Sequence, residues 1–154
     1  MKKITYFFLI LIALSSCKDE LDCCVNPSAN VSLKFTHNWN GTSINSSDFN
    51  SFKFTTENGE SLSINRLRYL ISNIRLINGN EVFTFSNYHL IDLGQEKGLS
   101  LSLPQNVFAG SYQLKFTFGF ADDDNKDGAY QDLNSVSFDV PTMLGGGYHY
   151  MQFD

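Results

Sequence analysis

Large apolar residues alternate with polar or small ones between positions 112 and 120, and this pattern constrains the fold more than any other feature. Tyr112, Leu114, Phe116, Phe118 and Phe120 are each separated by one glutamine, lysine, threonine or glycine. Side chains of a β-strand point alternately to opposite faces, so a period of two predicts a strand with one apolar face. The chain contains 14 Phe and 7 Tyr, and aromatic residues favour strands.

Shorter runs of the same kind recur along the chain and are separated by turn residues. They cover 31–36, 52–54, 69–77, 81–85, 88–92, 99–103, 136–140 and 148–153. Asn78-Gly79 follows one of these runs, and this dipeptide is a strong hairpin signal. A single helical turn at 63–67 would explain the helix-like apolar spacing that overlaps the run at 69–77. We therefore expect an all-β fold, an antiparallel β-sandwich of about eight strands.

The N-terminus has the features of a bacterial lipoprotein signal. A short basic segment at 1–3 precedes a mostly apolar run at 4–14, which is too short for a transmembrane helix. The run ends in Leu14-Ser15-Ser16-Cys17, a lipobox pattern, which predicts lipidation of Cys17. We assign 1–16 to a signal peptide, 17–30 to a lipidated tether and 31–154 to the folded domain. The alternative is an ordinary secretory signal with a cysteine nearby by chance.

The residues after Cys17 and the net charge indicate where the protein resides. Lys18-Asp19-Glu20 resembles an export signal that sends some lipoproteins to the outer face of the outer membrane. The formal charge of −5 becomes −7 when removal of 1–16 takes Lys2 and Lys3 with it. An acidic domain is repelled by phosphate backbones and anionic membrane surfaces, which argues against nucleic acid as a partner. We expect a protein that contacts the outer membrane through its lipid and faces the cell exterior.

Three histidines are the candidate ligands for a transition metal. His37, His89 and His149 each fall in or at the end of a predicted strand, in phase with large apolar residues. Imidazoles suit copper or zinc, and the thioether of Met143 or Met151 would favour Cu(I). The sequence therefore leaves two interpretations: one shared copper site at a rim of the sandwich, or three separate histidines hydrogen-bonded at the edges of the core.

An acidic segment carries oxygen ligands at the spacing of a calcium loop. Asp123, Asn125 and Asp127 stand at alternate positions and are followed by a glycine, as at the start of such a loop. Asn134 stands where an EF-hand has its bidentate glutamate, so Asp132 or Asn134 would have to complete the shell. The segment is either a calcium site on a β scaffold or a solvated acidic loop.

Four segments, in order, resemble sequence markers of the MbnP-like family, the methanobactin-associated copper-binding proteins and their lipoprotein relatives. They are 65–76 with its Ile-Ser-Asn, 88–92, the Gly-Phe at 119–120 with the acidic residues after it, and 143–149 with its Gly-Tyr element. The resemblance covers about 31–154 and implies an exported β-sandwich. Family members continue past the point where this chain ends, so we expect the domain to be incomplete at its C-terminus.

The resemblance also implies a function. Founding members of the family bind copper through histidines beside an oxidised tryptophan, and the only tryptophan here is Trp39. The motifs Gly-x-Ser-x-Gly and His-Glu-x-x-His and a phosphate-binding loop are absent from the sequence, so we expect no enzymatic activity. The sequence predicts a surface-exposed outer-membrane lipoprotein that binds or scavenges a metal ion, with copper as the expected metal. The alternative is a calcium-stabilised adhesion or glycan-binding module on the same fold.

Overall fold

The structure is a computed structural model that describes residues 27–154. The predicted signal peptide, the lipidated Cys17 and the tether up to residue 26 lie outside the described residues. Within this range the chain forms antiparallel strand pairs in an all-β fold, as expected, with one short helix, α2 (Gln131–Ser135). No helix in the described range is long and apolar enough to span a membrane.

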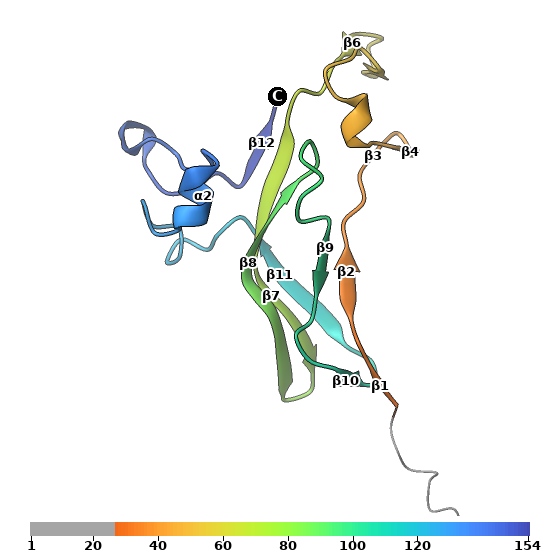
Figure 1. Cartoon of the computed structure of the whole chain (residues 1–154), viewed down its shortest axis with the longest axis vertical. Helices are drawn as coiled ribbons and strands as arrows, with labels where there is room; N and C mark the ends of the chain where they lie inside the picture. The colour runs from red at the N-terminus through yellow and green to blue at the C-terminus, as the bar shows by residue number, and fades with distance from the viewer. Residues whose placement is uncertain (1–26) are drawn as a thin grey trace, which may run out of the picture.

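A long hairpin is the spine of the molecule (Figure 1). β7 (Leu67–Asn78) and β8 (Glu81–Asp92) pair antiparallel over their whole length. They are joined by a two-residue turn at Gly79, whose φ of +57° suits glycine, so the hairpin predicted at Asn78-Gly79 is confirmed. β11 (Gln113–Phe118) and β12 (Met151–Phe153) both pair with the other edge of β7 and complete the main sheet.

Short strand pairs form a second layer along the hairpin and one end of the molecule (Figure 1). The pairs are β1 (Ser28–Ala29) with β10 (Val107–Phe108), β2 (Ser32–Lys34) with β9 (Ser100–Ser102), β3 (Asn38–Trp39) with β4 (Thr42–Ser43), and β5 (Phe54–Thr55) with β6 (Ser61–Leu62). A 3-10 turn, η2 (Ser46–Asp48), lies between β4 and β5. Because β1 is already paired, the folded domain begins before residue 31, earlier than expected.

β7 is buried on both faces, which explains its nearly continuous apolar sequence. Ile71 and Ile74 pack towards the second layer, whereas Leu70 packs on the opposite face. A regular strand would place Ile71 and Ile74 on opposite faces. A bulge resets the phase, because the β7–β8 register shifts after Ile74 and the adjacent Asn73 has a φ of +52°.

The C-terminal part of the chain forms a lobe, residues 119–150, on the other face of the main sheet (Figure 1). Its core consists of Phe120, Leu133, Phe138 and Tyr148 packed with Leu70 of β7. It contains α2 and a 3-10 turn, η3 (Thr142–Leu144). The strand predicted over 136–140 is reduced to one bridge, Asp139 with Tyr148, and the expected helical turn at 63–67 is absent. α2 was not predicted because a helix this short, with one buried residue, shows no period.

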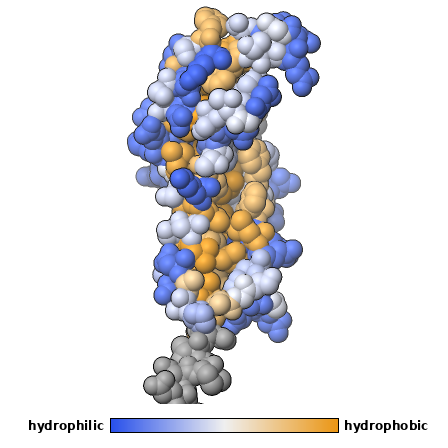
Figure 2. Space-filling view, turned by 90° about the vertical axis from the view of Figure 1, so that its right-hand side faces the viewer, coloured by the Kyte–Doolittle hydropathy of each residue, from blue (hydrophilic) through white to orange (hydrophobic). Residues whose placement is uncertain are grey.

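One part of the inner face is left open. The register places Leu114 opposite Leu76 and Phe118 opposite Ile71, so β11 directs these side chains inward. Nevertheless, Leu114, Phe118 and the intervening Phe116 are exposed, the last by 55%. They line an apolar groove of about 290 Å³ between β2 and β11. An apolar band also runs along the long axis of the molecular surface (Figure 2).

Candidate functional site

His37 and His89 lie near Tyr69 on the inner face of the main sheet. Nε2 of His37 is 3.0 Å from the Tyr69 hydroxyl, and the two ring centroids are 5.6 Å apart. His89 is paired with Ile71, which shares a face of β7 with Tyr69. The His89 ring stacks on Phe35 at 5.9 Å, and Phe35 precedes His37 by two residues. We refer to Phe35, His37, Tyr69 and His89 as the Tyr69 cluster.

The hydrogen bond of His89 fixes its tautomer. Nε2 of His89 lies 2.8 Å from the carbonyl oxygen of Gly98. A carbonyl only accepts, so Nε2 carries a proton, and in the neutral imidazole the free lone pair is therefore on Nδ1. Gly98 has a φ of +68°, and a Cβ there would lie 2.1 Å from the Leu90 carbonyl oxygen, so only glycine fits. Histidines that bind metals commonly donate their other ring N–H to a carbonyl in this way.

Burial favours the neutral forms of His37 and Tyr69. It lowers the pKa of His37 below its ordinary value of 6.5 and raises the pKa of Tyr69. A neutral imidazole is the form that binds a metal. Met151 of β12 is paired with Tyr69, so its thioether lies on the same face. Two imidazoles and one thioether are therefore placed on the same face of the sheet as Tyr69.

His149 lies on the other side of the main sheet. Its backbone N–H donates to the Phe138 carbonyl at 3.1 Å, and its ring packs edge-on against the Phe138 ring at 6.0 Å. Phe138 belongs to the lobe core with Leu70, on the face opposite Tyr69. The sequence placed His149 in phase with Met151, but β12 begins only at Met151 and the residues before it belong to the lobe.

The structure therefore does not bring the three predicted histidines together. Across residues 27–154, no group of three or more His, Cys, Asp or Glu side chains could hold a metal ion. Met143, the other thioether considered, is 90% exposed in the lobe turn η3. Trp39 packs against Phe54 in a core cluster that Tyr69 also contacts, and its indole N–H donates to the Thr55 carbonyl at 3.1 Å.

The predicted calcium ligands lie in the lobe and contact a neighbouring loop. Oδ1 of Asn125 accepts from the Tyr148 backbone N–H at 2.7 Å, and Oδ2 of Asp127 accepts from the Thr142 hydroxyl at 2.8 Å. Asp123 is exposed. Two of the three side chains thus hold the 121–130 loop against residues 142–148. Calcium binding by this loop stays a prediction.

The two residues considered for completing the calcium shell have partners elsewhere. Oδ1 of Asp132 accepts from the Tyr88 hydroxyl at 2.8 Å. Burial, followed by this hydrogen bond, raises the pKa of Tyr88 to about 12. Oδ1 of Asn134 accepts from the Tyr148 hydroxyl at 2.8 Å.

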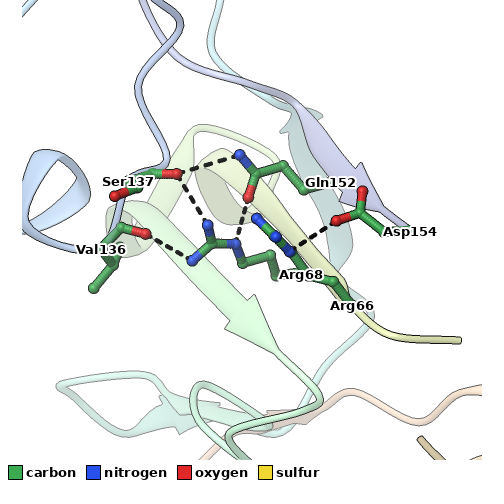
Figure 3. A network of polar contacts seen from close by, with 6 residues as sticks. All are labelled: Arg66, Arg68, Val136, Ser137, Gln152 and Asp154. Atoms are coloured by element: carbon green, nitrogen blue, oxygen red, sulfur yellow. Dashed lines mark hydrogen bonds and ion pairs between the residues drawn. The ribbon is translucent and has the colours of Figure 1, made fainter. Parts of the chain in front are cut away.

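Arg68 is a polar centre that the sequence pattern did not single out. It is only 8% exposed, on the lobe side of β7, and lies next to Arg66 (Figure 3). Its guanidinium donates to the carbonyls of Val136 and Ser137, at 2.8 and 2.9 Å, and to Oε1 of Gln152. The signal that would have revealed it is an arginine inside an otherwise apolar strand, because a buried charge requires partners.

Comparison with known families matches these observations. Residues 28–154 match the MbnP family, and this match covers all but the first of the residues that the structure describes. The chain belongs to the MbnP family. Residues 1–17 match the lipid attachment site of prokaryotic membrane lipoproteins, so this MbnP-family protein is a membrane lipoprotein whose attachment site ends at Cys17. Comparison with curated proteins and with solved structures gave no match.

Proposed function

We propose that this MbnP-family lipoprotein binds copper at the cell surface, held to the outer membrane by the lipid on Cys17, and is not an enzyme. The observation that carries the proposal is the common face of His37, His89 and Met151 around Tyr69. Family membership supports copper as the metal, and Lys18-Asp19-Glu20 supports surface exposure.

The donor types favour the reduced ion. Imidazole suits copper in either state, whereas a soft thioether selects Cu(I). Nδ1 of His89 is available for ligation because Nε2 is held by Gly98. The proposed copper site consists of His37, His89 and Met151, and His149 has no role in it.

Removal of either imidazole is expected to weaken Cu(I) binding. His37→Gln and His89→Gln should each raise the dissociation constant at least about tenfold, because each removes one proposed ligand. The measurement is competition with a chromophoric Cu(I) chelator, using the full chain in detergent. His149→Gln is the matched control, since it removes an imidazole on the far side of the sheet. Equal affinity in all three variants would refute the site.

The same titration has an expected pH dependence. The lowered pKa of His37 favours its neutral imidazole, so protons compete less for that nitrogen near neutral pH than they do at an ordinary histidine. As the pH falls through the pKa of His37, protonation should weaken copper binding. In His37→Gln, that contribution to the pH dependence should disappear. An unchanged pH profile in this variant would exclude His37 as a ligand.

A second candidate is a calcium-stabilised adhesion or glycan-binding module. It is favoured by the exposed aromatic residues Phe116 and Phe118 along the apolar groove, since aromatic surfaces serve in recognition. In this proposal Asp123, Asn125 and Asp127 bind calcium and stabilise the lobe.

Calcium should then raise the melting temperature of the wild type. Binding to the native state alone, at 100-fold excess over the dissociation constant, adds about 2.7 kcal/mol. Differential scanning fluorimetry with and without calcium measures the shift. The shift should vanish in Asp123→Ala/Asp127→Ala and persist in Asp122→Ala, which removes a carboxylate outside the ligand set. If calcium does not raise the melting temperature of the wild type, the segment is a solvated acidic loop and not a calcium site.

A further inference from the structure

We propose that a pocket on the lobe side of the main sheet binds a small organic acid through its carboxylate. This Arg68 pocket has a volume of about 420 Å³, within the range of small-molecule sites. Its lining includes four charged residues and two apolar ones, namely Arg66, Arg68, Asp92 and Lys97, and Leu90 and Val136. They come from the start of β7 and the residue before it, from β8 and the turn after it, and from the residue that follows α2, so residues distant in sequence meet there.

The pocket carries positive charge in an acidic protein. Arg66, Arg68 and Lys97 line the pocket with one carboxylate, Asp92, and Arg66 also pairs with Asp154, so the cations exceed these carboxylates by one, whereas the whole chain has a formal charge of −5. Asp92 is paired with Arg68 across the β7–β8 ladder, but its Oδ1 accepts from the Gln95 backbone N–H at 3.0 Å. A local excess of cations raises the concentration of anionic ligands.

Arg68 is a buried cation that makes no direct ion pair, although the charges of Asp92 and Asp154 act on it from a distance. Among residues 27–154 the ion pairs are Lys53 with Asp48 and Arg66 with Asp154, and neither involves Arg68. Its hydrogen bonds go to two backbone carbonyls and to the neutral amide of Gln152. Buried charges are normally paired with an opposite charge, so this arrangement is suited to an anion supplied from outside.

The guanidinium retains donors for such an anion. Of its five N–H groups, one on each nitrogen is used in the three hydrogen bonds to Gln152, Val136 and Ser137 (Figure 3). One N–H on each terminal nitrogen remains. Arginine binds carboxylates through paired N–H groups, and Lys97 adds to the attraction, as does Arg66, whose charge is partly offset by its ion pair with Asp154.

The remaining lining favours an organic acid over an inorganic anion. Leu90 and Val136 provide apolar walls, and the amide side chains of Asn65 and Gln95 also line the pocket. Amides hydrogen-bond hydroxyl groups. The combination suits a small hydroxylated acid, such as a sugar acid, whose carboxylate faces the arginines.

This site is separate from the proposed copper site. Arg68 and Tyr69 are consecutive residues of β7 and therefore point to opposite faces of the sheet. Leu90, which also lines the pocket, is paired with Leu70 on the lobe side. The proposed organic-acid site thus goes beyond the proposed function and does not depend on copper binding.

Calorimetric titration of the full chain in detergent tests the site, with glucuronate as probe and glucose as its uncharged counterpart. Wild type should bind glucuronate and not glucose. Arg66→Gln and Lys97→Gln should each weaken glucuronate binding about tenfold, because each removes one lining charge. Lys34→Gln is the matched control, since it removes one charge from the groove on the other face of the sheet and should leave the affinity unchanged. Circular dichroism establishes that each variant is folded.

Several outcomes would overturn the proposal. The first is that the wild type does not bind glucuronate. The second is that both Arg66→Gln and Lys97→Gln bind it with unchanged affinity. The third is that Lys34→Gln loses as much affinity as these two variants, which would indicate an effect of net charge. Tighter binding of inorganic phosphate than of glucuronate would overturn the assignment to organic acids. Copper binding is not read out in this experiment, so its result leaves the Tyr69 cluster to its own test.

Discussion

Arg68→Met is expected to lower the free energy of unfolding by about 3 kcal/mol. The guanidinium connects β7 to the carbonyls of Val136 and Ser137 and to Gln152, and so holds the lobe against the main sheet. It also lies 5.5 Å above the centre of the Phe138 ring. Methionine keeps much of the apolar volume but donates no hydrogen bond, so the acceptors are left without their partner. A buried acceptor that loses its donor costs about 1–3 kcal/mol, and water recovers part of that cost here.

Urea unfolding measures this change. The urea concentration at the midpoint of unfolding should fall, whereas the dependence of the unfolding free energy on urea concentration should stay constant. The reason is that wild type and variant expose nearly the same surface area on unfolding. Arg75→Met is the matched control, an exposed arginine on the same strand that should cost less than about 0.5 kcal/mol. If the two variants have equal stability, Arg68 does not hold the lobe in place.

Cys17→Ser is expected to abolish lipid attachment. The lipid attachment site covers residues 1–17 and ends at this cysteine, and a serine lacks the thiol that carries the lipid. Each buried CH₂ of an acyl chain contributes about 0.8 kcal/mol to membrane binding, so loss of the lipid should release the protein almost completely. Metabolic labelling with palmitate and fractionation of cells measure the two effects.

Cys23→Ser/Cys24→Ser is the control for this experiment. It removes the other two cysteines of the chain and should leave both labelling and membrane fractionation unchanged. Equal labelling of wild type and Cys17→Ser would refute attachment at Cys17. Loss of labelling in the control alone would move the attachment to the neighbouring cysteines.

The sequence alone predicted the features that depend on neighbours along the chain. The period of two around Phe116 predicted a strand, Asn78-Gly79 predicted the β7–β8 hairpin, and the segment ending at Cys17 predicted the lipid attachment site. These predictions succeed because strand alternation, turn geometry and signal recognition are set by residues within a short stretch. The resemblance to the MbnP-like family rested in the same way on short segments in a fixed order, and the family match confirms it.

Only the tertiary structure decided which side chains meet. Alternation gives the relative faces of residues within one strand, but not which face of one strand adjoins which face of another, and a bulge such as the one near Asn73 reverses the phase. His37 and His89 share a face because β7 and β8 pair in one register, whereas His149 lies with the lobe. Arg68 reaches Val136 and Ser137 across 68 and 69 positions of sequence. No local pattern encodes such a contact, because it arises only when the lobe closes over the sheet.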